Sequence, residues 1–150
     1  MPSISLAEFA DKLNELMPEM ARSIIRRQSD ELIKGKITLP QFFILNFLKK
    51  EGEQRMTDIA RILNVTTAAA TGLVDRMVKS GYATRVFDPQ DRRIIRVKLS
   101  VKGIDVVQRV LSHRRRMIMD TFGKISQQER EDYLRILMRV KDILTEENPQ

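Results

Sequence analysis

Along most of the chain, apolar residues recur at steps of three and four, which is the spacing of one face of an α-helix. Leu6, Phe9 and Leu13 begin one such stripe near the N-terminus. The pattern predicts helices at about residues 5–35, 38–52, 57–63, 67–79, 101–122 and 126–145. We therefore expect a mainly helical protein.

Helix-capping residues support several of these boundaries. A Ser or Thr followed three residues later by Glu or Gln marks helix starts at Ser5, Thr38 and Ser126. Pro18 lies within the first helical stretch, so we expect either a kink there or a second helix beginning after Met17. Gly35 is the expected end of this stretch.

The hydrophobic period changes to two in the middle of the chain. Residues 82–87 are one strand candidate, and in a second, 95–99, Ile95, Val97 and Leu99 alternate with two basic residues. The residues between them have turn chemistry and include Arg92 and Arg93. We expect a β-hairpin with one apolar face, one basic face and two arginines at its tip.

The segment before this hairpin has the pattern of a helix-turn-helix. The predicted helices 57–63 and 67–79 are separated by a short turn at Asn64 and Val65. Two helices joined by a turn of this length are typical of that motif. Together with the hairpin, they predict a winged helix-turn-helix over residues 36–99.

The predicted helices outside this unit carry apolar stripes that are too long for the winged unit to cover. A second chain is the natural cover, so segments 1–35 and 100–150 are expected to form a helical dimerisation unit. The expected fold class is mainly α with a small β wing: a winged helix-turn-helix flanked by N- and C-terminal dimerisation helices.

Charge and composition narrow the functions open to the chain. Its 150 residues include 27 Lys and Arg against 20 Asp and Glu, and the whole excess of +7 lies in residues 35–110. A basic segment favours a polyanionic partner, which here points to double-stranded DNA. With no Cys and a single His, the sequence offers no disulfide, thiolate zinc site or multi-histidine site, so no metal or cofactor is expected.

Two other classes of protein are disfavoured. The sequence has no Gly-rich phosphate loop, nucleophile elbow or metal-ligand motif, so we do not expect an enzyme. It also lacks a secretory leader pattern and a run of about 18 apolar residues, which predicts a cytoplasmic protein with no membrane partner.

Candidate DNA-binding residues lie at the start of the 67–79 helix and at the hairpin tip. The major groove admits an α-helix, and small side chains in the first turn let the helix axis approach the base edges. Hydroxyls can bond bases or phosphates, and arginines suit phosphates or a narrow minor groove. The candidates chosen on this basis are Thr66, Thr67, Ala68, Thr71, Arg76, Arg92, Arg93 and Arg55.

Simpler interpretations stay open for several residues. One of Thr66 and Thr67 is expected to cap the helix. Asp75 and Arg76 could form only a local structural pair, which we weigh equally with a phosphate contact by Arg76. The basic residues expected to be solvated surface are Lys36, Arg55, Lys79 and Arg85. The run 113–116 (HRRR) points all round a helix, so it cannot form one flat patch.

Four short motifs follow one another in order along the chain. They are ITLPQF at 37–42, MTDIA at 56–60 with Asn64-Val65 after it, TGLVDRM at 71–77, and Asp91-x-Arg93 followed after five residues by Leu99-Ser100-x-x-Gly103. Together they resemble the MarR (multiple antibiotic resistance regulator) family of transcription factors. The family patterns are LTxxQ, its helix-turn-helix opening, TGLVDRL, and DxRxxxxxLTxxG. Here Ser replaces the last Thr, and Asn64 replaces the Gly of the turn.

The resemblance implies a homodimer in which the flanking helices interleave and the two winged units read a pseudo-palindromic operator. It also implies that Asp91 and Arg93 hold and aim the wing, with Arg93 reaching the minor groove. We add Asp91 and Thr38, which lies in the first motif, to the candidate DNA-binding residues.

Many members of the family bind small, often phenolic, effectors between the dimer helices and the DNA-binding unit. Candidates for lining such a crevice are Met17, Met20, Phe42, Phe43 and Phe47, although residues at helical spacing are more often simply core. The sequence therefore predicts a DNA-binding transcriptional regulator, in particular a ligand-responsive repressor. The alternative is a winged-helix protein-interaction module without sequence-specific DNA binding.

Overall fold

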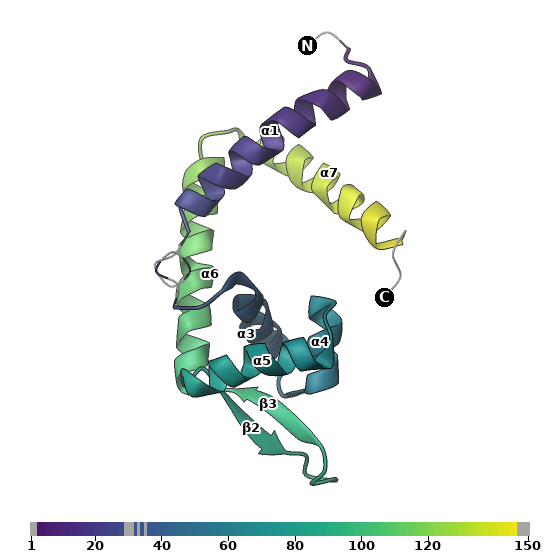
Figure 1. Cartoon of the computed structure of the whole chain (residues 1–150). Coiled ribbons are helices and arrows are strands. Elements are labelled where there is room, and N and C mark those ends of the chain that lie inside the picture. The colour runs from purple at the N-terminus through teal and green to yellow at the C-terminus, as the bar shows by residue number, and fades with distance from the viewer. Residues whose placement is uncertain (1–2, 29–31, 33, 35, 147–150) are drawn as a thin grey trace. The chain divides into compact units, whose positions relative to one another are not determined.

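The computed structural model describes residues 3–28, 32, 34 and 36–146. The chain divides into two compact units, Met1–His113 and Arg114–Gln150. Its elements are α1 (Leu6–Arg26), α3 (Leu39–Glu51), β1 (Gln54–Arg55), α4 (Met56–Leu63), α5 (Thr67–Lys79), β2 (Ala83–Phe87), β3 (Ile95–Leu99), α6 (Val101–Phe122) and α7 (Gln127–Glu146). Figure 1 labels all of them except β1. α6 contributes residues to both units, and α7 belongs to the second. The mainly α fold with a small β wing is confirmed.

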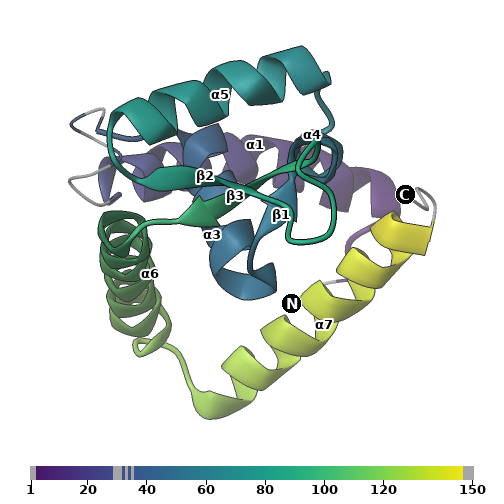
Figure 2. The same ribbon diagram turned by 90° about the horizontal axis from the view of Figure 1, so that it is seen from below.

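The sheet has three antiparallel strands in the order β1-β3-β2. β2 and β3 pair in the register Ala83↔Leu99 and Phe87↔Ile95, which makes the predicted hairpin. β1 was not predicted, because two residues are too few to show a period. It pairs Gln54 with Val97 and so ties the start of α4 to the hairpin. Figure 2 shows α5 running alongside β2.

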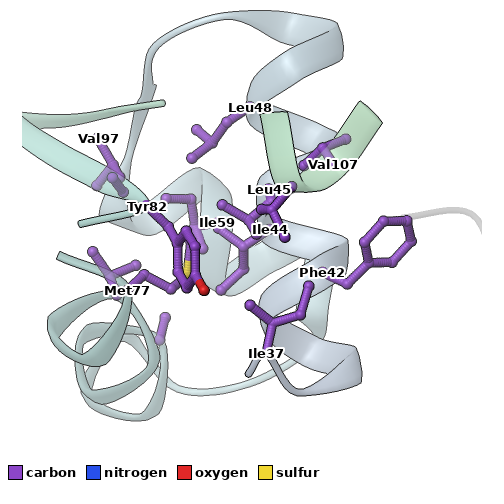
Figure 3. Packing of buried hydrophobic residues seen from close by; sticks show 14 of the residues in the cluster. Ile37, Phe42, Ile44, Leu45, Leu48, Ile59, Met77, Tyr82, Val97 and Val107 are labelled. Carbon is purple, nitrogen blue, oxygen red and sulfur yellow. The ribbon is translucent and has the colours of Figure 1, made fainter. Parts of the chain in front are cut away.

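The hydrophobic core of the first unit lies between α3, α4, α5, the base of the hairpin and the first half of α6. Its side chains face one another in Figure 3. The largest fully buried members are Phe42, Ile37, Ile44, Leu45, Ile59, Met77, Val74, Val97, Val106, Val107 and Val110. This core fixes the position of α5 relative to the hairpin, which is what the functional site requires.

Most of the predicted boundaries are confirmed to within a residue. Thr38 and Gln41 form the expected capping box, in which the Gln41 amide donates to the Thr38 hydroxyl at 3.3 Å and the Gln41 side chain accepts from the Thr38 amide at 2.9 Å. Ser126 and Glu129 form another before α7. In both cases the side chains satisfy amides that the first turn of a helix leaves unbonded. Gly52 ends α3 at φ 80°.

The first helix differs from its prediction. α1 is continuous through Pro18, so the expectation of a second helix after Met17 is wrong. Proline removes one intrahelical hydrogen bond, and the rest of a helix of 21 residues keeps its ladder. α1 ends at Arg26, and the predicted stop at Gly35 lies outside the described residues.

α6 packs one face on the core and leaves a second apolar row more exposed. Ile104 and Ile118 are exposed and Leu111 is partly buried, on the kind of stripe that the sequence assigns to a partner chain. The fully buried α6 positions are Gly103, Val106, Val107 and Val110. The valines form the row that packs on the core, and the absence of a side chain at Gly103 lets that row approach the hairpin.

Two helices contribute nothing to a core within the chain. The structure describes every residue of α1 and α7, and none of them is buried. Both helices nevertheless carry rows of large apolar side chains that are about half exposed. Among the described residues, no helix is both long and apolar enough to span a membrane.

Candidate nucleic-acid interface

The turn between α4 and α5 sets the angle at which α5 is presented. Asn64 adopts the left-handed conformation expected of it, with φ at 52°. Its amide donates to the Arg61 carbonyl, and the Val65 amide donates to the Ala60 carbonyl, both at 3.1 Å. The turn is thus closed by backbone hydrogen bonds and holds α5 against α4.

The first turn of α5 presents small side chains to solvent. Thr66 is the cap, and its hydroxyl accepts from the Ala69 amide at 3.1 Å. The Thr71 hydroxyl donates to the Thr67 carbonyl at 2.8 Å, so its hydrogen is already used. The Thr67 hydroxyl makes no hydrogen bond to the part of the chain that the structure describes. Thr67 and Ala68 are both exposed.

The two faces of α5 are well separated. Ala70, Val74 and Met77 are buried and attach the helix to the core. Arg76 is exposed, as a phosphate contact requires. The other member of the proposed local pair, Asp75, forms its ion pair with Arg85 of β2. The expectation of an Asp75–Arg76 pair is therefore wrong, because neighbouring residues on a helix point in different directions.

The wing, defined here as residues 83–99, is held at its outer end by a buried carboxylate. Asp88 accepts from Arg96 Nε at 2.6 Å, and from the backbone amides of Gln90 at 2.9 Å and Asp91 at 3.3 Å. The Gln90 amide, with the Arg96 guanidinium, holds the pKa of Asp88 below its ordinary value. Sequence reasoning missed this pair. The signal for it was an arginine on the largely apolar strand β3, opposite Val86.

Asp91 organises the tip of the wing. Its carboxylate accepts from the Arg93 amide at 3.0 Å and lies 3.6 Å from Arg93 Nε. The Arg93 side chain remains 93% exposed, and Arg92 is also exposed. The geometry accords with the role that the resemblance implies, in which Asp91 positions the tip and Arg93 reaches outward.

The base of the wing is joined closely to the start of α6. The Ser100 hydroxyl accepts from the Gly103 amide at 3.0 Å and donates to the Gly81 carbonyl. Lys102 Nζ donates to the Ser80 carbonyl at 2.8 Å and lies 4.8 Å from the centre of the Tyr82 ring. The Leu99-Ser100-x-x-Gly103 motif is therefore the joint at which the hairpin ends and α6 begins.

The remaining basic and polar candidates occupy less specific positions. Thr38 is exposed and uses its hydroxyl as the cap of α3. Arg55 is exposed at the junction of β1 and α4, where it pairs in register with Arg96. Lys36 and Lys79 are exposed, as expected of solvated residues. Arg85 is instead held by Asp75 and joins the wing to α5.

The structure does not gather the effector candidates at one surface. Phe42 is buried in the core, and Phe47 is partly buried against it. Phe43 is exposed, with its ring centroid 6.3 Å from that of Phe42. Met17 and Met20 are exposed on α1. Within the described ranges, no group of three or more His, Cys, Asp or Glu could hold a metal ion.

An exposed α5 start, set by a helix-turn-helix and placed beside an arginine-tipped hairpin, defines a winged helix-turn-helix DNA-binding protein. Comparison with known proteins agrees. The model of the MarR family matches residues 37–95. Over its winged unit the chain is therefore similar to this family, and the relatives named by the comparisons are transcriptional regulators.

Three relatives extend the similarity beyond the winged unit. The HTH-type transcriptional regulator YsmB of Bacillus subtilis is 29% identical over 120 residues, which cover 79% of this chain and 82% of YsmB. The HTH-type transcriptional repressor MdtR of the same organism is 27% identical over 77% of this chain and 69% of MdtR. The structure of a MarR family protein from Bacillus stearothermophilus has a TM-score of 0.80 at 25% identity, covering 95% of this chain and 99% of that one.

Proposed function

We propose that this transcriptional regulator is a ligand-responsive repressor that binds a pseudo-palindromic operator as a homodimer. The observation that carries the DNA-binding part is the pairing of an exposed α5 start with the exposed Arg92 and Arg93 of the wing. Arg85 and Asp75 link these two elements, so they would engage DNA as one body. The similarity to the repressor MdtR supports repression and not activation of the target genes.

The exposed apolar rows support the homodimer. On α1 they comprise Leu6, Phe9, Leu13, Leu16, Met17, Met20, Ile24 and Ile25. On α7 they comprise Tyr133, Leu134, Ile136, Leu137, Met138, Val140, Ile143 and Leu144. Such surfaces are far more apolar than a lone soluble chain normally exposes, and a second copy would cover them. We therefore assign dimerisation to segments 1–35 and 100–150, and DNA binding to 36–99.

The side chains at the start of α5 support a particular mode of reading DNA. Thr67 and Ala68 are short and cannot make the two-bond base contacts of Arg, Asn or Gln. We expect modest discrimination at each base, a preference for A·T-rich flanks under the wings, and a contribution from groove shape. A two-fold dimer would require half-sites about one helical turn, roughly 10 bp, apart.

Selection of bound duplexes from a random DNA pool tests the proposal. The expected product is an inverted repeat, and its affinity should fall steeply with salt, because phosphate contacts release counterions. Inserting about 5 bp at its centre should abolish tight binding, because the half-sites would then face opposite sides of the duplex. Recovery of no preferred duplex would favour the protein-interaction module instead.

The effector is the second part of the proposal. We propose a small aromatic molecule, supported by the exposed Phe43 ring. Screening aromatic compounds for release of the selected duplex tests this, with Phe43→Ala expected to weaken release but not DNA binding. We also propose that the protein acts in the cytoplasm, where its DNA target lies.

A further inference from the structure

The wing carries an exposed apolar pair at its outer end. Phe87 ends β2, Ile95 begins β3, and the two are register partners. Phe87 is 67% exposed and Ile95 is 45% exposed. Partners across an antiparallel pair lie within side-chain contact distance of one another. Even so, most of the Phe87 ring remains in water, so contact between the two does not account for the placement of a large aromatic side chain there.

Phe87 and Ile95 lie on the side of the hairpin that packs against the core nearer its base. Side chains on alternate register pairs share a face, so Phe87 and Ile95 lie on the same side as Arg85 and the fully buried Val97. At the base of the wing this face is covered by the body of the first unit. At the outer end, the side chains on the same side of the hairpin are exposed to solvent, next to the exposed Arg92 and Arg93 of the tip.

The pair is held on a rigid support. One step toward the body, Arg85 is fixed by its ion pair with Asp75 of α5. One step toward the tip, the buried Asp88 carboxylate binds Arg96 and the backbone of the turn. A surface fixed on both sides loses little conformational freedom when a partner covers it, which favours binding.

We propose that Phe87 and Ile95 form an apolar contact with the deoxyribose walls of the DNA minor groove, beside the point where the arginines of the wing enter. This inference rests on the proposed DNA-binding function and adds a contact that ionic recognition does not supply. Deoxyribose C–H groups line the walls of the minor groove and are the apolar surface that it offers to a wing. Known minor-groove binders also use apolar side chains such as Phe and Ile there, inserted between base steps.

The charge around the pair selects DNA over other occupants. Arg92 and Arg93 are exposed at the tip. A second copy of the wing would bring the same positive charges together, which is unfavourable. DNA supplies phosphates for the arginines on either side of the sugars that would cover the apolar pair. The wing would then bind through an ionic part, which salt weakens, and an apolar part, which salt does not.

The test compares two kinds of wing variant over a salt series. The probe is the tightest duplex recovered from the random pool, and the protein is the full chain. Phe87→Ala should bind it about threefold to tenfold more weakly at every salt concentration, with an unchanged slope of log affinity against log salt. Arg93→Ala should instead make that slope shallower, by about 0.9 for each phosphate that the variant no longer neutralises.

Matched controls keep the result specific. Val101→Ala removes an apolar side chain that is 85% exposed at the start of α6, off the wing, and should bind as the wild type does. Phe87→Leu keeps an apolar side chain and should restore most of the affinity. Thermal unfolding of each variant should match the wild type, because the side chains removed are mostly in solvent.

Three results would overturn the inference. Phe87→Ala could bind the duplex as tightly as the wild type, or it could lose affinity only through a changed salt slope. It could also leave DNA binding intact while lowering the mass of the protein in light scattering, which would make the pair a contact between copies of the chain. If the wild type prefers no duplex, the proposed function fails with it, whereas the first three results leave that function standing.

Discussion

Gly103 and Gly72 both lie within helices, but only Gly103 lacks room for a side chain. A Cβ at Gly103 would overlap the Tyr82 carbonyl, whereas nothing lies within 4 Å of a Cβ at Gly72. We expect Gly103→Ala to lower the free energy of unfolding by at least about 1–3 kcal/mol, because neither backbone can easily move aside. Gly72→Ala is the matched control and should be neutral or stabilise the protein by up to about 1 kcal/mol. Urea unfolding measures the stability of both variants, and equal stabilities would contradict the close approach of Gly103 to the Tyr82 carbonyl.

The Asp88 carboxylate should make part of the stability depend on pH. The pKa of Asp88 is lowered from its ordinary value of 3.8 by the Gln90 amide and by Arg96. The ionised form is therefore favoured in the folded protein, and its contribution is present above pH 3.8 and is lost as the pH falls through the lowered pKa. Asp88→Asn should destabilise the protein at neutral pH, with the difference from the wild type shrinking toward acid. A difference that stayed constant down to the acid end would rule out this role.

A substitution at Arg93 should weaken DNA binding without changing the stability of the fold. The Arg93 side chain is almost wholly in solvent, and within the described residues its ion pair is with the Asp91 carboxylate at the tip. Arg93→Ala should cost about 1–3 kcal/mol of operator affinity and leave the thermal unfolding midpoint unchanged. Asp91→Ala should also weaken binding, through a less ordered tip. Fluorescence anisotropy with a labelled duplex measures both, and wild-type affinity in both variants would remove the wing from the interface.

At the scale of one helix, the two threonines that begin α5 should separate folding from binding. The Thr66 hydroxyl caps the helix, whereas the Thr67 hydroxyl bonds nothing in the described part of the chain. Thr66→Ala should lower the free energy of unfolding by about 0.5–2 kcal/mol. Thr67→Ala should leave stability within about 0.5 kcal/mol and lower operator affinity. Denaturant unfolding and anisotropy on the same preparations distinguish the two, and a destabilised Thr67→Ala protein would contradict the assignment.

The elements that the sequence predicted well are those fixed by local chemistry. The caps at Ser5, Thr38 and Ser126 depend on residues three apart, and the turn at Asn64 depends on one left-handed residue. Because these interactions join residues that are close together in the sequence, the sequence alone predicts them, and most helix boundaries were correct to within a residue.

The elements that the sequence missed depend on distant partners. β1 exists because Gln54 and Arg55 meet a strand about forty residues later in the chain. Asp75 was assigned to Arg76, but its partner is Arg85, which reaches it across the joint between α5 and β2. The Asp88–Arg96 pair depends in the same way on the hairpin closing first. In the candidate interface, the exposed residues that would contact DNA could therefore be chosen from the sequence. The ion pairs that position them, such as Asp75–Arg85 and Asp88–Arg96, could not.

At the scale of the whole molecule, the apolar row on α7 should control folding and assembly together. Leu137 is about half exposed in the single chain, and a partner would bury it. Leu137→Asp should reduce both the dimer fraction and the thermal stability, because it would place an unpaired charge in the interface. Arg139→Asp changes charge on the opposite side of the helix and is the control. Light scattering gives the assembly state, and a wild-type mass of one 17.4 kDa chain would contradict the homodimer.

The proposed homodimer, with its wings and its assembling helices in different parts of the chain, has a genetic consequence. A subunit with Arg93→Ala would keep its α1 and α7 rows and would still pair with wild-type subunits. In a cell with both alleles, most dimers would then carry at least one defective wing, so the mutant allele should be dominant and should derepress the target genes. A Leu137→Asp subunit would be excluded from dimers and degraded, so that allele should be recessive. Wing mutations and helix mutations should therefore be recovered by opposite genetic screens.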